Sequence, residues 1–169
     1  MLTCSRLWIS TGRDRGGSVR HYGRVSLLIP VCEPCSFCEF LEGRLPYTIL
    51  ERDELTATLV TREQRGLGHL LVIPVRHRET ILDLPADEGT ALMAGVTRAA
   101  RLVARAYTAE GVAVWQNNGT PAHQTVPHVH FHVAATLPGG GTNWGEVPRL
   151  SVDATNAIAA RLRSPGPAV

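Results

Sequence analysis

The order of apolar and polar residues predicts short strands on either side of one long helix. Apolar runs of strand length lie at 47–51, 55–60, 70–73, 112–116 and 129–134. After Pro85, apolar residues recur at steps of three and four, which predicts a long helix that packs one face on a sheet and is ended by Gly111. Shorter helices are predicted at 36–41, with Ser36 as the N-cap, and at 154–162. Strands, a helix and further strands with several short connections predict an α+β domain on an antiparallel sheet.

The two ends of the chain differ from its centre. Residues 11–18 have turn and linker chemistry without periodicity, and 25–29 could pair as an edge strand. We therefore expect 1–31 to be a poorly ordered N-terminal extension. One domain follows at 32–137, and 138–169 forms a Gly-rich loop with a short helix.

Composition narrows the class of protein. The chain has 169 residues, of which 44% are hydrophobic and 19% charged, so one folded domain with a substantial core is expected. The net charge of +2 provides no basic footprint for nucleic acid. The apolar run at 25–31 is too short for a membrane span and lacks a signal-peptide cleavage pattern. We expect a cytoplasmic protein without nucleic-acid or membrane partners.

The segment with the most chemical content alternates three histidines with apolar residues: His128, His130 and His132. Alternate residues of a strand face the same side, so the imidazoles line one surface while the intervening apolar residues face the core. A neutral imidazole can serve as a nucleophile, a general base or a metal ligand. The pattern alone leaves three interpretations open: a catalytic set, a metal-binding ribbon, or three surface histidines on an edge strand.

Three cysteines lie at successive CxxC spacings, at Cys32, Cys35 and Cys38. In a reducing compartment this spacing favours metal binding over disulfides. Reduced thiols packed in the core are the alternative.

Several segments together resemble the histidine triad (HIT) family. Residues 128–134 match its signature, His-φ-His-φ-His-φ-φ with φ apolar, at every position. The likeness extends over 32–134: residues 35–43 are similar to the family's CxFCxIxxGxIP, 68–77 to GHxLVIPxxH, and 117–126 to NxGxxxGQxV. The resemblance implies a HIT-like fold of about five antiparallel strands with one long and one short helix, assembled as a homodimer.

The resemblance also implies an activity, cleavage of a nucleotide at its α-phosphorus. His130 corresponds to the nucleophile, which forms a nucleotidyl-histidine that water later releases. His132 corresponds to a phosphate-contacting histidine, and the backbone carbonyl after the triad would orient His130. The implied catalytic residues are His128, His130, His132 and Gln124. The implied nucleotide-binding residues are Asn117, Thr125, Phe37, Phe40, Leu45, Leu59 and Thr61.

A zinc-containing branch of the family implies the metal ligands. These are Cys35, Cys38, His77 and His128. Cys₂His₂ is a closed tetrahedral set, so the implied Zn²⁺ is structural. Cys32 could substitute for Cys35, and a metal-free arrangement with His77 bonded to His128 is the alternative.

Three departures leave the substrate open. Thr61 stands where the family has a ribose-binding acid, His123 where it has a small Gly, and residues 135–141 where it has Pro-Arg. The predicted substrates are a nucleoside phosphoramidate, an acyl-nucleotide or a dinucleoside polyphosphate. Alternatives are a nucleotidyltransferase, a specialised-pathway enzyme of the same superfamily, and a catalytically silent nucleotide-binding or scaffold protein. His132 argues against the uridylyltransferase branch, which has Gln at that position.

Overall fold

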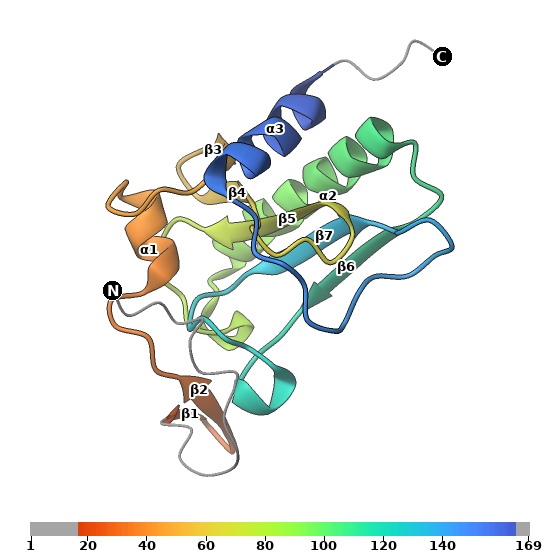
Figure 1. The fold of residues 1–169 in the computed structure, drawn as a ribbon. Coiled ribbons are helices and arrows are strands. Elements are labelled where there is room, and N and C mark those ends of the chain that lie inside the picture. Colours follow the sequence, from red (N-terminus) through yellow and green to blue (C-terminus); the bar gives the residue numbers. More distant parts are fainter. Residues whose placement is uncertain (1–16, 165–169) are drawn as a thin grey trace.

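A five-stranded antiparallel sheet lies at the centre of the computed structural model, which describes residues 17–164 (Figure 1). Its strand order is β3-β4-β5-β7-β6. The strands are β3 (Ile49–Arg52), β4 (Thr56–Val60), β5 (Leu67–Pro74), β6 (Val112–Gln116) and β7 (Phe131–Ala135). Every neighbouring pair is antiparallel, so the predicted α+β class and five-stranded sheet are confirmed.

One face of the sheet is covered by the long helix α2 (Ala86–Tyr107). Its buried apolar residues are Leu92, Val96, Ala99 and Val103, which share a core cluster with apolar residues of β4, β5 and β7. Pro85 occupies the N-cap, and two acidic residues in the first turn interact favourably with the positive end of the helix dipole. The predicted end at Gly111 is wrong, because Thr108 takes a left-handed conformation (φ 47°) that closes the helix four residues after Ala104.

The other face of the sheet carries α1 (Ser36–Leu41). Phe37 and Leu41 pack there against apolar residues of β4 and β5. The predicted N-cap is wrong, since Cys35 occupies this position without a side-chain cap and Ser36 is already helical. The two helices α1 and α2 therefore lie on opposite faces of the sheet (Figure 1).

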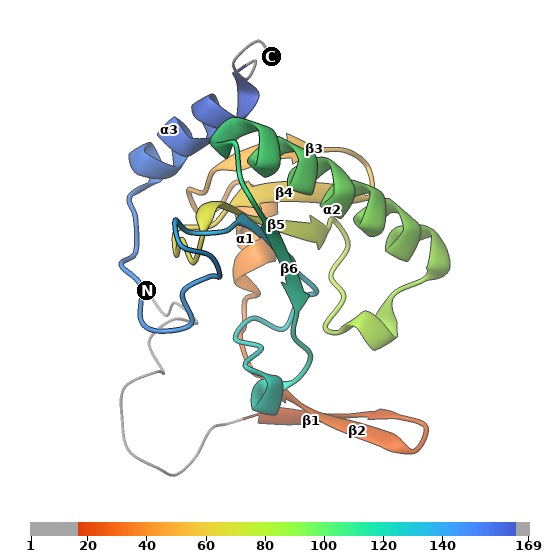
Figure 2. The same cartoon turned by 90° about the vertical axis from the view of Figure 1, so that its right-hand side faces the viewer.

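Residues 17–30 form a separate β-hairpin. Strands β1 (Gly17–Tyr22) and β2 (Val25–Pro30) pair with each other and not with the central sheet. Figure 2 shows this hairpin beside the loop that joins β6 to β7, and β2 contacts the 3-10 helix η3 (Thr120–Ala122) of that loop. The expectation of a poorly ordered extension is therefore wrong for 17–30, while residues 1–16 lie outside the described residues.

After β7 the chain returns along the β4–β5 connection and ends in α3 (Val152–Arg163). Asn143 donates its backbone N–H to the Arg65 carbonyl (2.7 Å). The Oγ of Ser151 caps α3, which packs Ala159 and Leu162 into the same core cluster as α2. Within the part of the chain that the structure describes, no helix is long and apolar enough to cross a membrane.

Candidate active site

The HxHxH segment is not at an edge of the sheet: His132 lies in the interior strand β7, and His128 and His130 lie in the three residues before it. His132 pairs across the ladder with Leu71 of β5 and Trp115 of β6, so β7 has a neighbour on each side. His128 has no exposed surface and His130 only 5%. The interpretation as three surface histidines on an edge strand is therefore wrong. Phe131 and Val133 face the α2 side, as the alternation predicts.

A backbone carbonyl fixes the ring of His130. Nδ1 of His130 lies 2.7 Å from the carbonyl oxygen of His128, so Nδ1–H donates and Nε2 keeps its lone pair. Burial lowers the pKa of His130 to about 4, against the hydrogen bond to His128, which raises it, and the imidazole is neutral at pH 7. The predicted carbonyl after the triad is wrong: residues 128–130 precede the regular ladder, which leaves the His128 carbonyl free to face the ring.

A fourth histidine, which sequence reasoning did not assign to the site, holds His132. Nε2 of His69 lies 3.0 Å from Nδ1 of His132, and the Trp115 ring stacks on His132 at 4.7 Å and 4°. These contacts engage Nδ1 of His132 and fix the plane of its ring. Burial, followed by the neighbouring imidazoles, lowers the pKa of His132. Strand parity places His69 on the same face of β5 as Leu71, but the pairing of Leu71 with His132 comes from the structure, so the sequence alone carried no signal for this contact.

The buried imidazole of His69 predicts a loss of stability in acid. Burial lowers the pKa of His69 from 6.5 to about 4, so the unfolded chain binds this proton first as the pH falls. The free energy of unfolding therefore decreases from about pH 6.5 to about pH 4. In His69→Gln we expect this slope to be shallower by up to about 1.4 kcal/mol per pH unit in urea titrations. The exposed His21→Gln serves as the control, and equal slopes in both variants would contradict the prediction.

The loop between β6 and β7, residues 117–130, is held by its own amides. Gln124 accepts the Gly119 N–H (2.7 Å) and donates Nε2 to the carbonyls of Glu79 (2.7 Å) and Val126 (3.0 Å). Asn117 donates its amide to the Ala122 carbonyl. The predicted catalytic Gln124 is thus 2% exposed and bonded within the loop.

Two of the departures from the family pattern now have a structural context. His123 has a left-handed backbone (φ 65°), a conformation that favours Gly and explains why a small residue suits this position. Thr61 is buried, and its hydroxyl accepts the N–H of Glu63 (3.3 Å). Thr125 of the same loop as His123 is exposed.

Three of the four apolar residues predicted to line a base lie in one cluster next to the triad. Phe37, Phe40 and Leu59 belong to the cluster under α1, and the edge of Phe37 meets the His130 ring at 5.3 Å. Phe40 stacks on Tyr47 at 4.1 Å. Leu59 has no exposed surface and Leu45 is half-buried, so their contact with a ligand stays a prediction.

Two cysteines and two histidines converge beside the triad, at Cys35, Cys38, His77 and His128. Their donor atoms all lie within 4.8 Å of one another. The distances from Sγ of Cys38 to Nδ1 of His77 and His128 are 3.5 and 3.8 Å, and Sγ of Cys35 lies 3.5 Å from Nδ1 of His128. A tetrahedron with Zn–S of about 2.3 Å and Zn–N of about 2.0 Å separates S and N by about 3.5 Å. The donor set therefore fits a closed zinc site, in which Cys35 and not Cys32 takes part.

The protonation of these ligands also suits a cation. Nε2 of His128 lies 3.0 Å from the Pro74 carbonyl, so it carries the proton and Nδ1 is the free donor. Burial raises the pKa of Cys35, but the contacts of its thiol with His128 and His77 outweigh burial and lower the pKa to about 5. Burial and the neighbouring Cys35 thiolate raise the pKa of Cys38 to about 12. Without a cation Cys38 therefore keeps its proton beside the Cys35 thiolate, and a divalent metal would stabilise both cysteines as thiolates.

Comparison with known proteins decides the family. The family model for the HIT domain matches residues 42–138, which include the whole triad. The chain belongs to the HIT family.

Individual HIT relatives agree with this assignment. An uncharacterized HIT-like protein of Methanocaldococcus jannaschii is 32% identical over 121 residues, 70% of this chain and 93% of the relative. An adenosine 5′-monophosphoramidase of Schizosaccharomyces pombe is 32% identical over 133 residues, 77% and 96% of the two chains.

Solved structures of HIT proteins share the fold and bear on the metal. A HIT-like protein from Bartonella henselae superposes with a TM-score of 0.72 at 22% identity, over 79% of this chain and 96% of the other. A Zn-bound histidine triad family protein from Mycobacterium smegmatis superposes with a TM-score of 0.65 at 28% identity, over 76% and 93%. The Cys₂His₂ cluster and this Zn-bound relative support the zinc-containing branch.

Proposed function

We propose that this HIT protein is a nucleotide hydrolase that cleaves at the α-phosphorus through a nucleotidyl-histidine on His130. The observation that carries the proposal is the bond from Nδ1 of His130 to the His128 carbonyl. It fixes the tautomer in which Nε2 has a free lone pair, and the lowered pKa keeps this ring neutral. A neutral, oriented imidazole is what nucleophilic catalysis requires. The adenosine 5′-monophosphoramidases among the relatives supply the reaction class.

The reaction proceeds in two displacements at phosphorus. Nε2 of His130 forms a bond to the α-phosphorus, and the leaving group departs with the electrons of the bond that breaks. The departing group takes up a proton from solvent. Water then attacks the same phosphorus and loses a proton to solvent, the bond from phosphorus to Nε2 breaks with its electrons returning to His130, and a nucleoside monophosphate is released. Nε2 of His132 is assigned to a phosphate oxygen, because His69 and Trp115 fix its ring.

The β6–β7 loop is assigned to the phosphate. Thr125 and the loop amides contact it, while Gln124 holds the loop and Asn117 closes it. Phe37 and Phe40 are assigned to the base. Thr61 offers a hydroxyl in place of a carboxylate, so a weaker contact with the ribose diol is expected.

Zinc and a second subunit complete the proposed assembly. The four ligands would hold Zn²⁺ in a structural role, which ties α1 to the residue before the catalytic strand. The homodimer is proposed through the edge strand β6, where Val112 and Val114 are 36% and 48% exposed. Tyr107 is a weaker candidate, because Arg161 of the same chain lies over its ring at 4.3 Å.

The proposal is tested by the release of nucleoside monophosphate. The substrates are adenosine and guanosine phosphoramidates, an acyl-adenylate and diadenosine polyphosphates. We expect turnover of at least one class, with phosphoramidates first. Binding of adenosine monophosphate without any turnover would instead favour the silent binding protein, and transfer of the nucleotide to an acceptor other than water would favour a nucleotidyltransferase.

A further inference from the structure

The N-terminal hairpin has one face on the body of the protein and one face in solvent. In its register Arg20 pairs with Leu27 and Ser18 with Ile29, and these residues face the body. Ile29 has no exposed surface. On the other face Val19 is 55% exposed, and among residues 17–164 the hydrogen bond of the His21 side chain runs across the hairpin to Ser26 (2.8 Å). A two-stranded hairpin is at best marginally stable alone, so the contacts of its inner face hold it in place.

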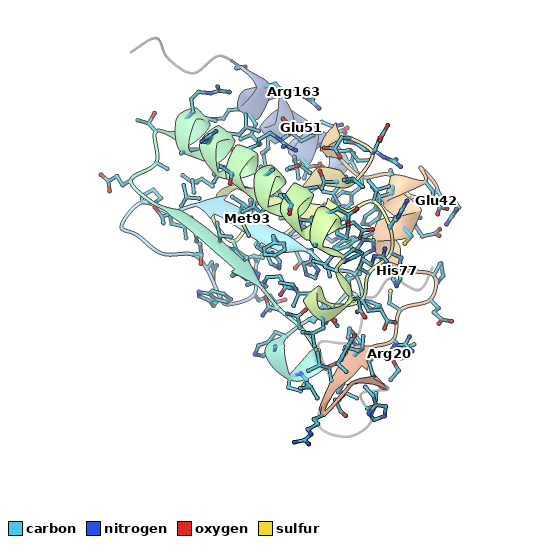
Figure 3. All side chains as sticks on the ribbon, turned by 180° about the vertical axis from the view of Figure 1, so that it is seen from behind. Arg20, Glu42, Glu51, His77, Met93 and Arg163 are labelled. Atoms are coloured by element: carbon cyan, nitrogen blue, oxygen red, sulfur yellow. The ribbon has the colours of Figure 1, made fainter. Side chains whose placement is uncertain are left out.

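These contacts converge on the segment that supports the β6–β7 loop. The guanidinium of Arg20, labelled on the hairpin in Figure 3, donates two hydrogen bonds to the Glu79 carboxylate, one of them 2.7 Å long. The backbone carbonyl of the same Glu79 accepts Nε2 of Gln124 at 2.7 Å. Tyr22 donates to Asp83 (2.9 Å) and accepts from Thr80 (3.0 Å), the two residues that cap the 3-10 helix η2 (Ile81–Asp83). One residue, Glu79, therefore joins the hairpin to the loop.

The hairpin also touches the loop directly. Gly119 has a positive φ of 82°, and a Cβ at this position would lie 3.2 Å from the Leu28 carbonyl and 3.9 Å from Cβ of Leu27. The N–H of Gly119 donates to Gln124. The backbone of β2 therefore packs against Gly119, the residue whose N–H bonds to Gln124 and closes the loop.

We propose that the N-terminal hairpin is a positioning element for the β6–β7 loop, with Arg20 and Glu79 as its positioning residues. The inference rests on the proposed function, in which this loop contacts the substrate phosphate. The hairpin lies outside residues 42–138, which match the HIT domain, so it supplements the part of the chain that the family defines. A loop of this length with two left-handed residues gains its order from what packs behind it, and small displacements of a phosphate site are costly for catalysis.

The test compares Arg20→Ala and Glu79→Gln with the outer-face control His21→Ala. An exposed ion pair contributes little to global stability, so all three melting temperatures are expected to stay within a few degrees of wild type. We expect Arg20→Ala to weaken adenosine monophosphate binding at least tenfold while adenosine binding changes less than twofold. Glu79→Gln should show the same change in affinity. The double variant should lose no more affinity for adenosine monophosphate than either single variant, because the two residues act through one contact. His21→Ala should match wild type.

Amide hydrogen exchange provides a readout that needs no substrate. In Arg20→Ala we expect the amides of Gly119, Ala122 and Gln124 to exchange at least tenfold faster, with no change in His21→Ala. Unchanged exchange would overturn the hairpin's hold on the loop, even if the wild type bound no nucleotide and the proposed function failed. If the loop amides of Arg20→Ala exchanged faster but its affinities for adenosine monophosphate and adenosine fell by the same factor, the role in phosphate positioning would be overturned.

Discussion

Replacement of His130 by Asn is expected to abolish turnover, with a decrease in kcat on the order of 10⁴-fold or more. The variant lacks the nitrogen that bonds to phosphorus, and no neighbouring imidazole can take its place. Nε2 of His132 is assigned to a phosphate oxygen and its Nδ1 contacts His69, while His128 faces the cysteines through Nδ1 and the Pro74 carbonyl through Nε2. The Asn amide can still donate to the His128 carbonyl, so the fold and the metal content should stay unchanged. The measurement is nucleoside monophosphate release at saturating phosphoramidate.

A second histidine variant controls for general damage. His21→Asn alters an exposed imidazole on the outer face of the hairpin and should keep kcat within twofold of wild type. Denaturation of a trapped reaction in alkali, in which a bond from phosphorus to imidazole is stable, should recover nucleotide bound to the wild-type protein and none bound to His130→Asn. Retention of a tenth or more of the turnover in His130→Asn would remove this residue as the nucleophile.

Replacement of Cys38 by Ser is expected to remove most of the zinc and to lower the melting temperature by roughly 10 °C, the equivalent of a few kcal/mol in a chain of this size. Sγ of Cys38 contacts the rings of both histidine ligands, so its loss opens the tetrahedron on two edges. Metal content by elemental analysis and thermal unfolding by circular dichroism measure the two effects. The rate of nucleotide hydrolysis should also decrease, because the backbone carbonyl of the metal ligand His128 orients the ring of His130.

The neighbouring cysteine distinguishes between the two possible ligand pairs. Cys32 lies outside the four-residue cluster, so Cys32→Ser should keep one zinc per chain. A full zinc content in Cys38→Ser, or loss of zinc in Cys32→Ser, would show that the metal is held by another set. His130→Asn should retain its zinc, which separates the metal effect from the chemical one.

Local patterns in the sequence predicted those features in which the interacting residues follow a fixed spacing along the chain. The alternation around His130 predicted which side chains face the core, and the steps of three and four predicted α2. The Cys₂His₂ set came from resemblance, and the structure brings all four residues together. For the strand and the helix the decisive spacing lies within a few residues of chain, whereas the four metal ligands span 35–128 and were joined only by the resemblance.

Features that depend on distant partners were not predictable in this way. The hairpin is fixed by the pair Arg20–Glu79, which is 59 residues apart, and no local periodicity signals such a contact. His69 meets His132 across 63 residues, and only the strand pairing reveals it. The end of α2 depends on a single left-handed residue, Thr108, which is an unusual choice for that conformation and gave no signal.

The alternation of β7 also restricts how such a protein can change in evolution. Insertion or deletion of one residue within β7 would exchange its two faces, so His132 would enter the apolar core and Val133 would enter the site. This strand is therefore fixed in length, whereas the β6–β7 loop and the segment from Pro138 to Leu150 can gain or lose residues without altering the parity. New leaving-group preferences are thus expected to arise from indels in those two segments, and from point substitutions alone in the strand.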